Sequence, residues 1–204
     1  MGDSAKKLYL ASSNSGKLRE FLTIAGERAG LVLELELLPG FAKLPAFPED
    51  APTFAENAAG KAQYASAMSE EAVCADDSGL VVPSLGVEPG VRSARYAGAN
   101  ASGTENIARL LTALQGKSAK ERLAHFVCAL AVARRGRVVA VVTSRVDGEI
   151  LETPRGSEGF GYDPVFYFPP LKKTFAEISG DDKNLHSHRG KAFRRLLEVL
   201  PGML

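Results

Sequence analysis

Three patterns in the sequence predict an α/β protein. An apolar strand at residues 8–11 leads through a polar loop into a segment with apolar residues at helical spacing. Two further helices are expected after Thr53 and Ser102, where a glutamate three residues on has the spacing of a capping box. Long apolar runs at 123–133 and 138–146 flank Arg134-Arg135-Gly136-Arg137, as in a β-hairpin. No internal repeat, low-complexity tract or linker divides the chain, which favours one domain over residues 1–204 that could be bilobed.

Composition excludes several functional classes. With 204 residues, 45% hydrophobic and 24% charged, the chain can form one substantial core. A net charge of +1 argues against binding to long nucleic acid or to an anionic membrane. Cys74 and Cys128 lie in apolar runs and are expected to be core thiols of a reducing compartment, and three histidines without a CxxC motif do not favour zinc. The short apolar run near the start is not typical of a signal peptide, so we expect a cytoplasmic protein.

The first polar loop, residues 12–17 (SSNSGK), precedes the first helix. A helix N-terminus offers free N–H groups and a partial positive charge, and Lys17 adds a full charge, so the loop could bind phosphate. It is not a Walker loop, because the first glycine is missing and Lys17 precedes Leu18 rather than Ser or Thr. The alternative is simple capping of the helix by Ser or Asn.

Residues 31–38 alternate like a half-exposed strand, and a proline-punctuated loop at 39–52 carries two acids before an alanine-rich helix that ends near Met68. Three polar residues of this helix could be a solvated face or one wall of a cleft: Glu56, Asn57 and Lys61.

The stretch at 73–82 reads VCADDSGLVV, for which we expect a strand, an acidic pair, a tight turn at Ser78-Gly79 and a second strand. Adjacent carboxylates repel each other, and a hard cation that prefers oxygen ligands would relieve the repulsion between Asp76 and Asp77. The alternative is an ordinary Asp-Ser-Gly turn in which side chains bond their own backbone.

The last third of the chain combines glycines, aromatics and bases. In GSEGFGYDPVFYF (156–168) the glycines permit close approach of the backbone to a ligand, and Phe160 and Tyr162 offer flat faces for a base. Aromatic clusters also form cores, which is our expectation for Phe166 and Phe168. A basic run at 183–191 precedes a last amphipathic helix and is either solvated or a group of hydrogen-bond donors.

In this order the motifs resemble those of the inosine triphosphate pyrophosphatase family, which includes the bacterial dITP/XTP pyrophosphatases. The likeness covers nearly the whole chain. The matching segments are SSNSGK (12–17), TFAENA (53–58), ADDSGL (75–80), PGVRSARYAG (89–98), GFGYDP (159–164) and SHRGKA (187–192).

The resemblance implies a fold and a set of site residues. The fold would be an elongated mixed β-sheet flanked by helices, in two lobes with the active site in the cleft between them, usually as a homodimer. Asp77 would be the catalytic proton acceptor and a Mg²⁺ ligand. Family members often carry a second acid before the TFxEN helix, for which Glu49 is the candidate and Asp50 the substitute. The substrate-binding residues would be Ser12, Ser13, Asn14, Ser15, Gly16 and Lys17 for the triphosphate, Ser78 beside the substrate, Phe160, Gly161, Tyr162 and Asp163 for the nucleoside, and Lys183, His188 and Arg189 for the base.

The implied reaction is Mg²⁺-dependent hydrolysis of nonstandard purine nucleoside triphosphates (ITP, dITP and XTP) to the monophosphate and pyrophosphate, which removes deaminated purines from the nucleotide pool. Three alternatives remain open at this point. A Maf-like nucleotide pyrophosphatase would need a basic pair near the first loop, where this chain has Lys17-Leu18-Arg19. A non-catalytic nucleotide-binding module would release no pyrophosphate, and a metal-dependent phosphomonoesterase would release orthophosphate.

Overall fold

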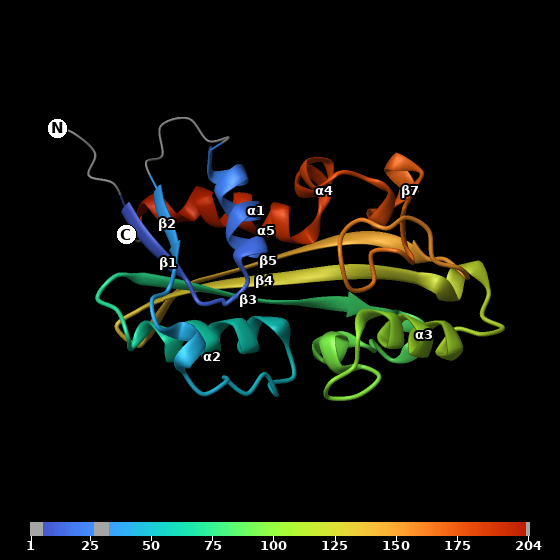
Figure 1. Cartoon of the computed structure of the whole chain (residues 1–204), viewed down its shortest axis with the longest axis horizontal. Helices are drawn as coiled ribbons and strands as arrows, with labels where there is room; N and C mark the ends of the chain where they lie inside the picture. Colours follow the sequence, from blue (N-terminus) through green and yellow to red (C-terminus); the bar gives the residue numbers. More distant parts are fainter. Residues whose placement is uncertain (1–5, 27–32, 203–204) are drawn as a thin grey trace. The chain divides into compact units, whose positions relative to one another are not determined.

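The computed structural model describes residues 6–26 and 33–202 (Figure 1). Seven strands form a mixed sheet of order β2-β1-β3-β4-β5-β6-β7, in which β1 is parallel to β2 and β3, and β6 is antiparallel to β5 and β7. The strands are β1 (Lys6–Leu10), β2 (Leu33–Leu37), β3 (Ala72–Val81), β4 (Leu123–Arg134), β5 (Arg137–Ile150), β6 (Phe166–Phe168) and β7 (Lys173–Thr174). The helices are α1 (Ser15–Gly26), α2 (Phe54–Ser66), α3 (Gly103–Ala113), α4 (Gly180–His186) and α5 (His188–Val199). None of the described helices has the length and apolar character needed to cross a membrane. The α/β class with a mixed sheet flanked by helices is confirmed.

The chain forms two compact units. The first comprises the described residues up to Asp77 together with Cys128–Ser144 and those from Arg189 on; the second comprises Ser78–Val127 and Arg145–His188. Each unit has its own buried apolar cluster.

In the first unit, helices cover both faces of the sheet (Figure 1). Successive strand residues point to opposite faces, so β3 sends Cys74 to the side of α1 and α5, and Val73 and Ala75 to the side of α2. On the α1 and α5 side, Phe21 and Phe193 stack with ring centroids 4.3 Å apart and are fully buried. On the other side α2 contributes small residues, among them Ala58 and Ala62, so the helix can lie close to the strands.

In the second unit the apolar cluster is rich in aromatic rings. Phe166 lies 4.5 Å from Phe126 and 5.0 Å from Phe175 between ring centroids, and α3 adds Ile107 and Leu110. The expectation that Phe166 and Phe168 are core residues is confirmed.

Local signals in the sequence mark several elements correctly. The hairpin of β4 and β5 turns at Arg135-Gly136, both at positive φ (49° and 74°), as a two-residue hairpin turn requires. Ser102 and Glu105 form the expected capping box, and the Thr53 side chain accepts a hydrogen bond from the Glu56 N–H at the start of α2. The strand expected at 31–38 is β2, although Leu31 and Val32 lie outside the described residues.

Two local predictions are wrong. The tight turn at Ser78-Gly79 does not form, because β3 runs unbroken from Ala72 to Val81. The strand residues before and after Ser78-Gly79 are buried, and this burial outweighs the preference of serine and glycine for turns. The Ser93 hydroxyl also accepts a hydrogen bond from the Leu80 N–H, which helps to hold the end of the strand. The basic run at 183–191 does not precede the last helical segment but is itself helical, in α4 and the start of α5.

The stacked rings of Phe21 in α1 and Phe193 in α5 provide a test of the apolar cluster of the first unit. We expect Phe193→Ala to lower the free energy of unfolding by about 3–5 kcal/mol, because it removes a fully buried ring and leaves a cavity. Leu22→Ala on the exposed side of α1 is the control and is expected to cost less than about 1 kcal/mol. Chemical denaturation measures both variants, and equal losses would contradict the assignment of this core.

Candidate active site

The loop at residues 12–17 is organised by its own side chains. Asn14 Oδ1 accepts hydrogen bonds from the backbone N–H groups of Gly16 (2.8 Å) and Lys17 (3.3 Å), and Ser12 Oγ accepts one from the Asn14 N–H (3.0 Å). Capping by asparagine is therefore present. It does not exclude phosphate binding, because residues 13–15 remain exposed at the start of α1. The loop is thus preformed at a helix N-terminus, with the Lys17 side chain beside it.

The two adjacent aspartates of β3 point to opposite faces of the sheet. Asp76 bonds Lys17 on the α1 side, whereas Asp77 bonds Asn57 of α2 on the other side. Strand alternation therefore separates the two carboxylates, and each has its own hydrogen-bond partner. The sequence-based interpretation, in which one cation relieves a repelling pair, does not describe this geometry.

Asp77 has the environment expected of a proton acceptor. Its Oδ2 accepts a hydrogen bond from Asn57 Nδ2 (2.9 Å), and Asn57 is itself fully buried. Burial raises the pKa of Asp77 to about 6, the Asn57 hydrogen bond and the Lys61 charge oppose the rise, and the Glu49 and Asp76 carboxylates add to it. At neutral pH the group is therefore ionised and more basic than an exposed aspartate.

Glu49 is the acid of the preceding loop that acts on Asp77. Its Oε1 lies 2.5 Å from the ammonium of Lys61 on α2, and its charge is one of those that raise the Asp77 pKa. Burial alone would lower the pKa of Lys61, but Asp76, Glu49 and Asp77 raise it. Asp50 is exposed.

The Glu49 and Asp77 pair fits a magnesium ion. Within residues 6–26 and 33–202, no group of three or more His, Cys, Asp or Glu side chains could hold a metal by itself. Mg²⁺ does not need such a cage, since it keeps several waters and is usually held by one or two carboxylates together with substrate phosphates. Two carboxylates of like charge, one of them with a raised pKa, supply the oxygen ligands that it prefers.

In the second unit, Asp163 organises the glycine-aromatic loop. Its Oδ2 accepts a hydrogen bond from the Phe160 N–H (2.7 Å) and pairs with the ammonium of Lys183 on α4. A side chain at Gly159, which has φ 75°, would collide with this carboxylate. The Lys183 Nζ lies 4.6 Å from the centroid of the Phe160 ring, which is 56% exposed. The loop therefore presents one exposed ring with a buried ion pair beneath it.

The other residues of this loop differ in exposure. Tyr162 is buried, and its hydroxyl donates to the backbone oxygen of Ser93 (2.9 Å), so Phe160 is the ring that offers an exposed face. Gly161 packs near the backbone of Gly103, and Ser78 is half-buried in β3. His188 is buried at the start of α5 with its ring stacked on Phe126 at 4.7 Å.

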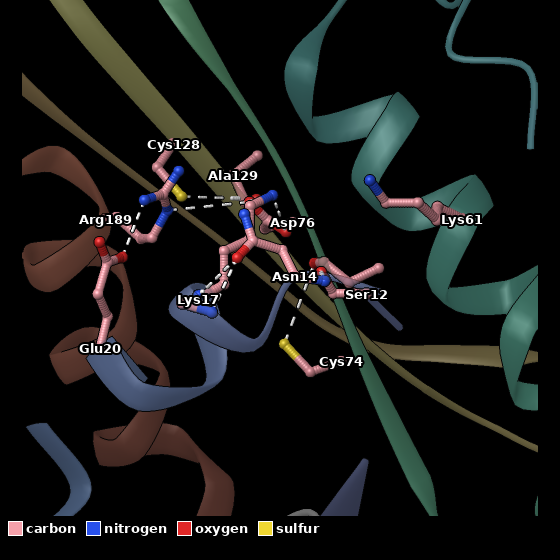
Figure 2. A network of polar contacts seen from close by, with 12 residues as sticks. Ser12, Asn14, Lys17, Glu20, Lys61, Cys74, Asp76, Cys128, Ala129 and Arg189 are labelled. Atoms are coloured by element: carbon pink, nitrogen blue, oxygen red, sulfur yellow. Dashed lines mark hydrogen bonds and ion pairs between the residues drawn. The ribbon is translucent and has the colours of Figure 1, made fainter. Parts of the chain in front are cut away.

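Arg189 belongs to the first unit, and its side chain is almost fully buried. Its Nη1 donates to Glu20 Oε2 of α1 at 2.8 Å, and its Nε lies 4.0 Å from Asp76 Oδ2 (Figure 2). The guanidinium therefore lies in the same charge network as Lys17.

The sequence singles out Asn57, Lys61 and Asp76 but assigns none of them a definite role. It leaves Asn57 and Lys61 open between a solvated face and a cleft wall, although their spacing of four residues places both on one side of α2. The period of two in a strand could have assigned Asp76 and Asp77 to different faces, had the turn not been expected there.

Comparison with known proteins gives consistent matches over nearly the whole chain. The model of the Ham1 family matches residues 8–199. A dITP/XTP pyrophosphatase of Geobacillus kaustophilus is 49% identical over 95% of this chain and 93% of its own, and that of Acidobacterium capsulatum is 47% identical over 97% and 100%. The solved Ham1 protein of Staphylococcus aureus matches with a TM-score of 0.85 at 38% identity, over 97% of this chain and 99% of its own. The resemblance inferred from the motifs is confirmed.

The raised pKa of Asp77 generates a pH-dependent prediction. In the folded protein the pKa of Asp77 is about 6, above the usual value of 3.8. The folded state therefore holds the Asp77 proton more tightly than the unfolded chain does. As pH rises from about 4 to about 6, the free energy of unfolding falls. We expect Asp77→Asn to raise the free energy of unfolding of the metal-free protein at pH 8 by about 2 kcal/mol.

That advantage should shrink as pH falls through about 6 and vanish below about 4. Urea denaturation across pH measures it, with the exposed Asp50→Asn as control. A variant less stable than the wild type at pH 8 would contradict the assigned environment.

Proposed function

The chain belongs to the Ham1 family, and on this basis we propose that it hydrolyses ITP, dITP and XTP to the nucleoside monophosphate and pyrophosphate. The observation that carries the proposal is the environment of Asp77: a buried carboxylate with a pKa of about 6, held by Asn57 and adjoined by the Glu49 and Lys61 charges. Such a group can accept a proton from water at neutral pH. The role would be removal of deaminated purines from the nucleotide pool.

In the proposed mechanism Asp77 is the general base. The Asn57 amide occupies Oδ2, so we assign Oδ1 as the atom that takes the proton from the attacking water. The water oxygen bonds to the α-phosphorus, the bond to the bridging oxygen breaks, and pyrophosphate departs with the electron pair. Because negative charge builds on the leaving group, positive groups positioned there lower the barrier.

The first unit supplies these positive groups. Residues 12–17 would bind the triphosphate through the N-terminus of α1 and through the Lys17 ammonium. Ser78, the first residue of the second unit, would lie beside the substrate. Glu49 and Asp77 would hold Mg²⁺, which when bound supplies charge stabilisation to the phosphate oxygens. Asp50 is the weaker candidate for this role because it is exposed, whereas the Glu49 charge acts on Asp77.

The second unit supplies the nucleoside site. The exposed face of Phe160 would stack on the base, while the backbone of Gly161 and the buried Tyr162 and Asp163 would keep the loop in shape. Lys183 and His188, with Arg189 of the first unit, would donate hydrogen bonds to the base. Hypoxanthine and xanthine carry a carbonyl at position 6, whereas adenine carries an amino group there, so donors favour the former. Arg189 must exchange its contacts with Glu20 and Asp76 to do this.

We also propose a cytoplasmic homodimer. Both cysteines are free and buried, in keeping with a reducing compartment. In the first unit, Val139 and Val141 lie on the same face of β5 and are 40% and 44% exposed, and exposed apolar side chains on one strand face are typical of a surface that a second copy covers. Sedimentation equilibrium should give twice the mass of the chain, and a monomer at micromolar concentration would contradict the proposal.

The reaction itself is tested by separating pyrophosphate from orthophosphate after incubation with Mg²⁺ and each of ITP, XTP, GTP and ATP. We expect pyrophosphate from ITP and XTP and little from GTP or ATP. Asp77→Asn should lose at least about 10²-fold in kcat, since a positioned general base contributes ~10²–10⁴-fold. Asp147→Asn, at an exposed aspartate that has no role in the proposed site, is the matched control and should retain the wild-type rate.

Other results of these assays would support different conclusions. Equal cleavage of all four nucleotides would refute the base-reading residues while leaving the phosphate site in place. Orthophosphate as product would indicate a phosphomonoesterase, and no release at all would indicate a binding module. Wild-type activity in Asp77→Asn would remove Asp77 from the mechanism.

A further inference from the structure

The carboxylate of Asp76 is almost completely buried, yet it takes no part in the mechanism described for Asp77. It lies on β3 and faces α1 and α5, where both of its oxygens accept hydrogen bonds from the Lys17 ammonium, at 2.9 and 2.8 Å (Figure 2). Its side chain is 1% exposed and that of Lys17 is 24% exposed. Burying a charge is costly, so a carboxylate at this position requires compensation by its neighbours.

Three cations surround Asp76, and they differ in their other partners. Lys61 also pairs with Glu49, and Arg189 also pairs with Glu20. Within the described part of the chain, the ion pair of Lys17 is with Asp76 alone. Burial alone would raise the pKa of Asp76, but Lys17, Arg189 and Lys61 together hold it well below the usual range, so the group stays ionised at every physiological pH.

The position of the Lys17–Asp76 ion pair indicates a role other than stabilising the fold. A buried ion pair is weak evidence for stabilisation, because apolar replacements are often as stable. Lys17, however, lies in the first turn of α1, next to the loop that would bind phosphate. A lysine ammonium is a point charge on a flexible four-carbon stem, and an acceptor that binds it with both oxygens restricts where that charge lies.

We propose that Asp76 is a positioning residue, which holds the Lys17 ammonium beside the loop at residues 12–17 so that it meets the negative charge on the departing pyrophosphate. This inference rests on the proposed function. Asp76 would contact no substrate atom and would act only through Lys17. The adjacent aspartates of β3 would thus serve one reaction from opposite faces: Asp77 accepts the proton, and Asp76 fixes the counter-charge of the leaving group.

A double-mutant cycle tests the proposal with Asp76→Asn, Lys17→Gln and the double variant, using ITP and Mg²⁺. We expect Lys17→Gln to lower kcat by about 10²-fold and Asp76→Asn by about 10-fold or more, because the negative charge that the ammonium meets grows in the transition state. Lys17→Gln should also raise KM, since Lys17 contacts the bound triphosphate, whereas Asp76→Asn should change KM less. The double variant should be no slower than Lys17→Gln. Losses that multiply would overturn the proposal, because Asp76 would then act independently of Lys17.

A matched control is the exposed pair Lys7 and Glu36, 3.2 Å apart between β1 and β2. Lys7→Gln and Glu36→Gln remove the same charges from the same unit and should leave kcat unchanged. Asp76→Glu, which restores the charge, should recover part of the rate lost in Asp76→Asn. No recovery in a folded Asp76→Glu would count against positioning.

A measurement on the wild-type protein guards against variants that fail to fold. Nitrogen-15 NMR of lysine side chains should show slow proton exchange at the Lys17 ammonium, whose signal is identified by its absence in Lys17→Gln, since both Asp76 oxygens bind it. Fast exchange at Lys17 would overturn the proposal whatever the kinetics.

Failure of this inference is distinct from failure of the proposed function. Impaired Lys17→Gln with a wild-type rate in Asp76→Asn would refute the role of Asp76 alone. A wild-type rate in Lys17→Gln would refute both the positioning role and the part of Lys17 in catalysis. No pyrophosphate from any nucleotide would refute the function.

Discussion

The alternation of side chains along β3 is the constraint on which the rest of the first unit depends. It sends Cys74 and Asp76 toward α1 and α5, and Val73, Ala75 and Asp77 toward α2. One register therefore sets two apolar layers and two polar environments at once. A shift by a single residue would exchange the two aspartates and bury each beside the wrong partners.

The two environments give neighbouring residues opposite acid–base behaviour. Asp76 is surrounded by cations and remains a fixed negative charge, whereas burial and like charges bring the pKa of Asp77 close to physiological pH. Both groups have the same chemistry and adjacent positions in the chain. The difference comes from the helices that cover each face, since α1 and α5 supply Lys17 and Arg189, and α2 supplies Asn57.

Much of the fold could be predicted because its signals are local. Apolar periodicity and capping boxes marked the helices, and the Arg135-Gly136 turn marked the hairpin. The turn at Ser78-Gly79 was wrong because local propensity there is overruled by burial of the residues on both sides, which depends on contacts distant in sequence. For the same reason Phe160 and Tyr162 could not be told apart, since only packing decides which ring is exposed.

Within the candidate site, residue types were easier to predict than their partners. The motifs pointed to Asp77, Lys17 and the aromatic loop, and all of these lie within the family match over residues 8–199. Residue spacing alone does not show which side of a helix packs against a strand. The sequence therefore could not decide whether Asn57 and Lys61 face solvent or the candidate site. Ion pairs such as Lys17 with Asp76 join residues 59 positions apart and follow only from the assembled sheet.

Ser93 has a consequence for how base preference could change. Its hydroxyl accepts a hydrogen bond from the Leu80 N–H, and its backbone oxygen accepts one from the Tyr162 hydroxyl. One serine in a connecting segment therefore links the end of β3 to the loop that carries Phe160. If Phe160 stacks on the base as proposed, substitutions at Ser93 would alter base preference without touching the nucleotide, and a redesign of that preference would have to include Ser93 and its neighbours.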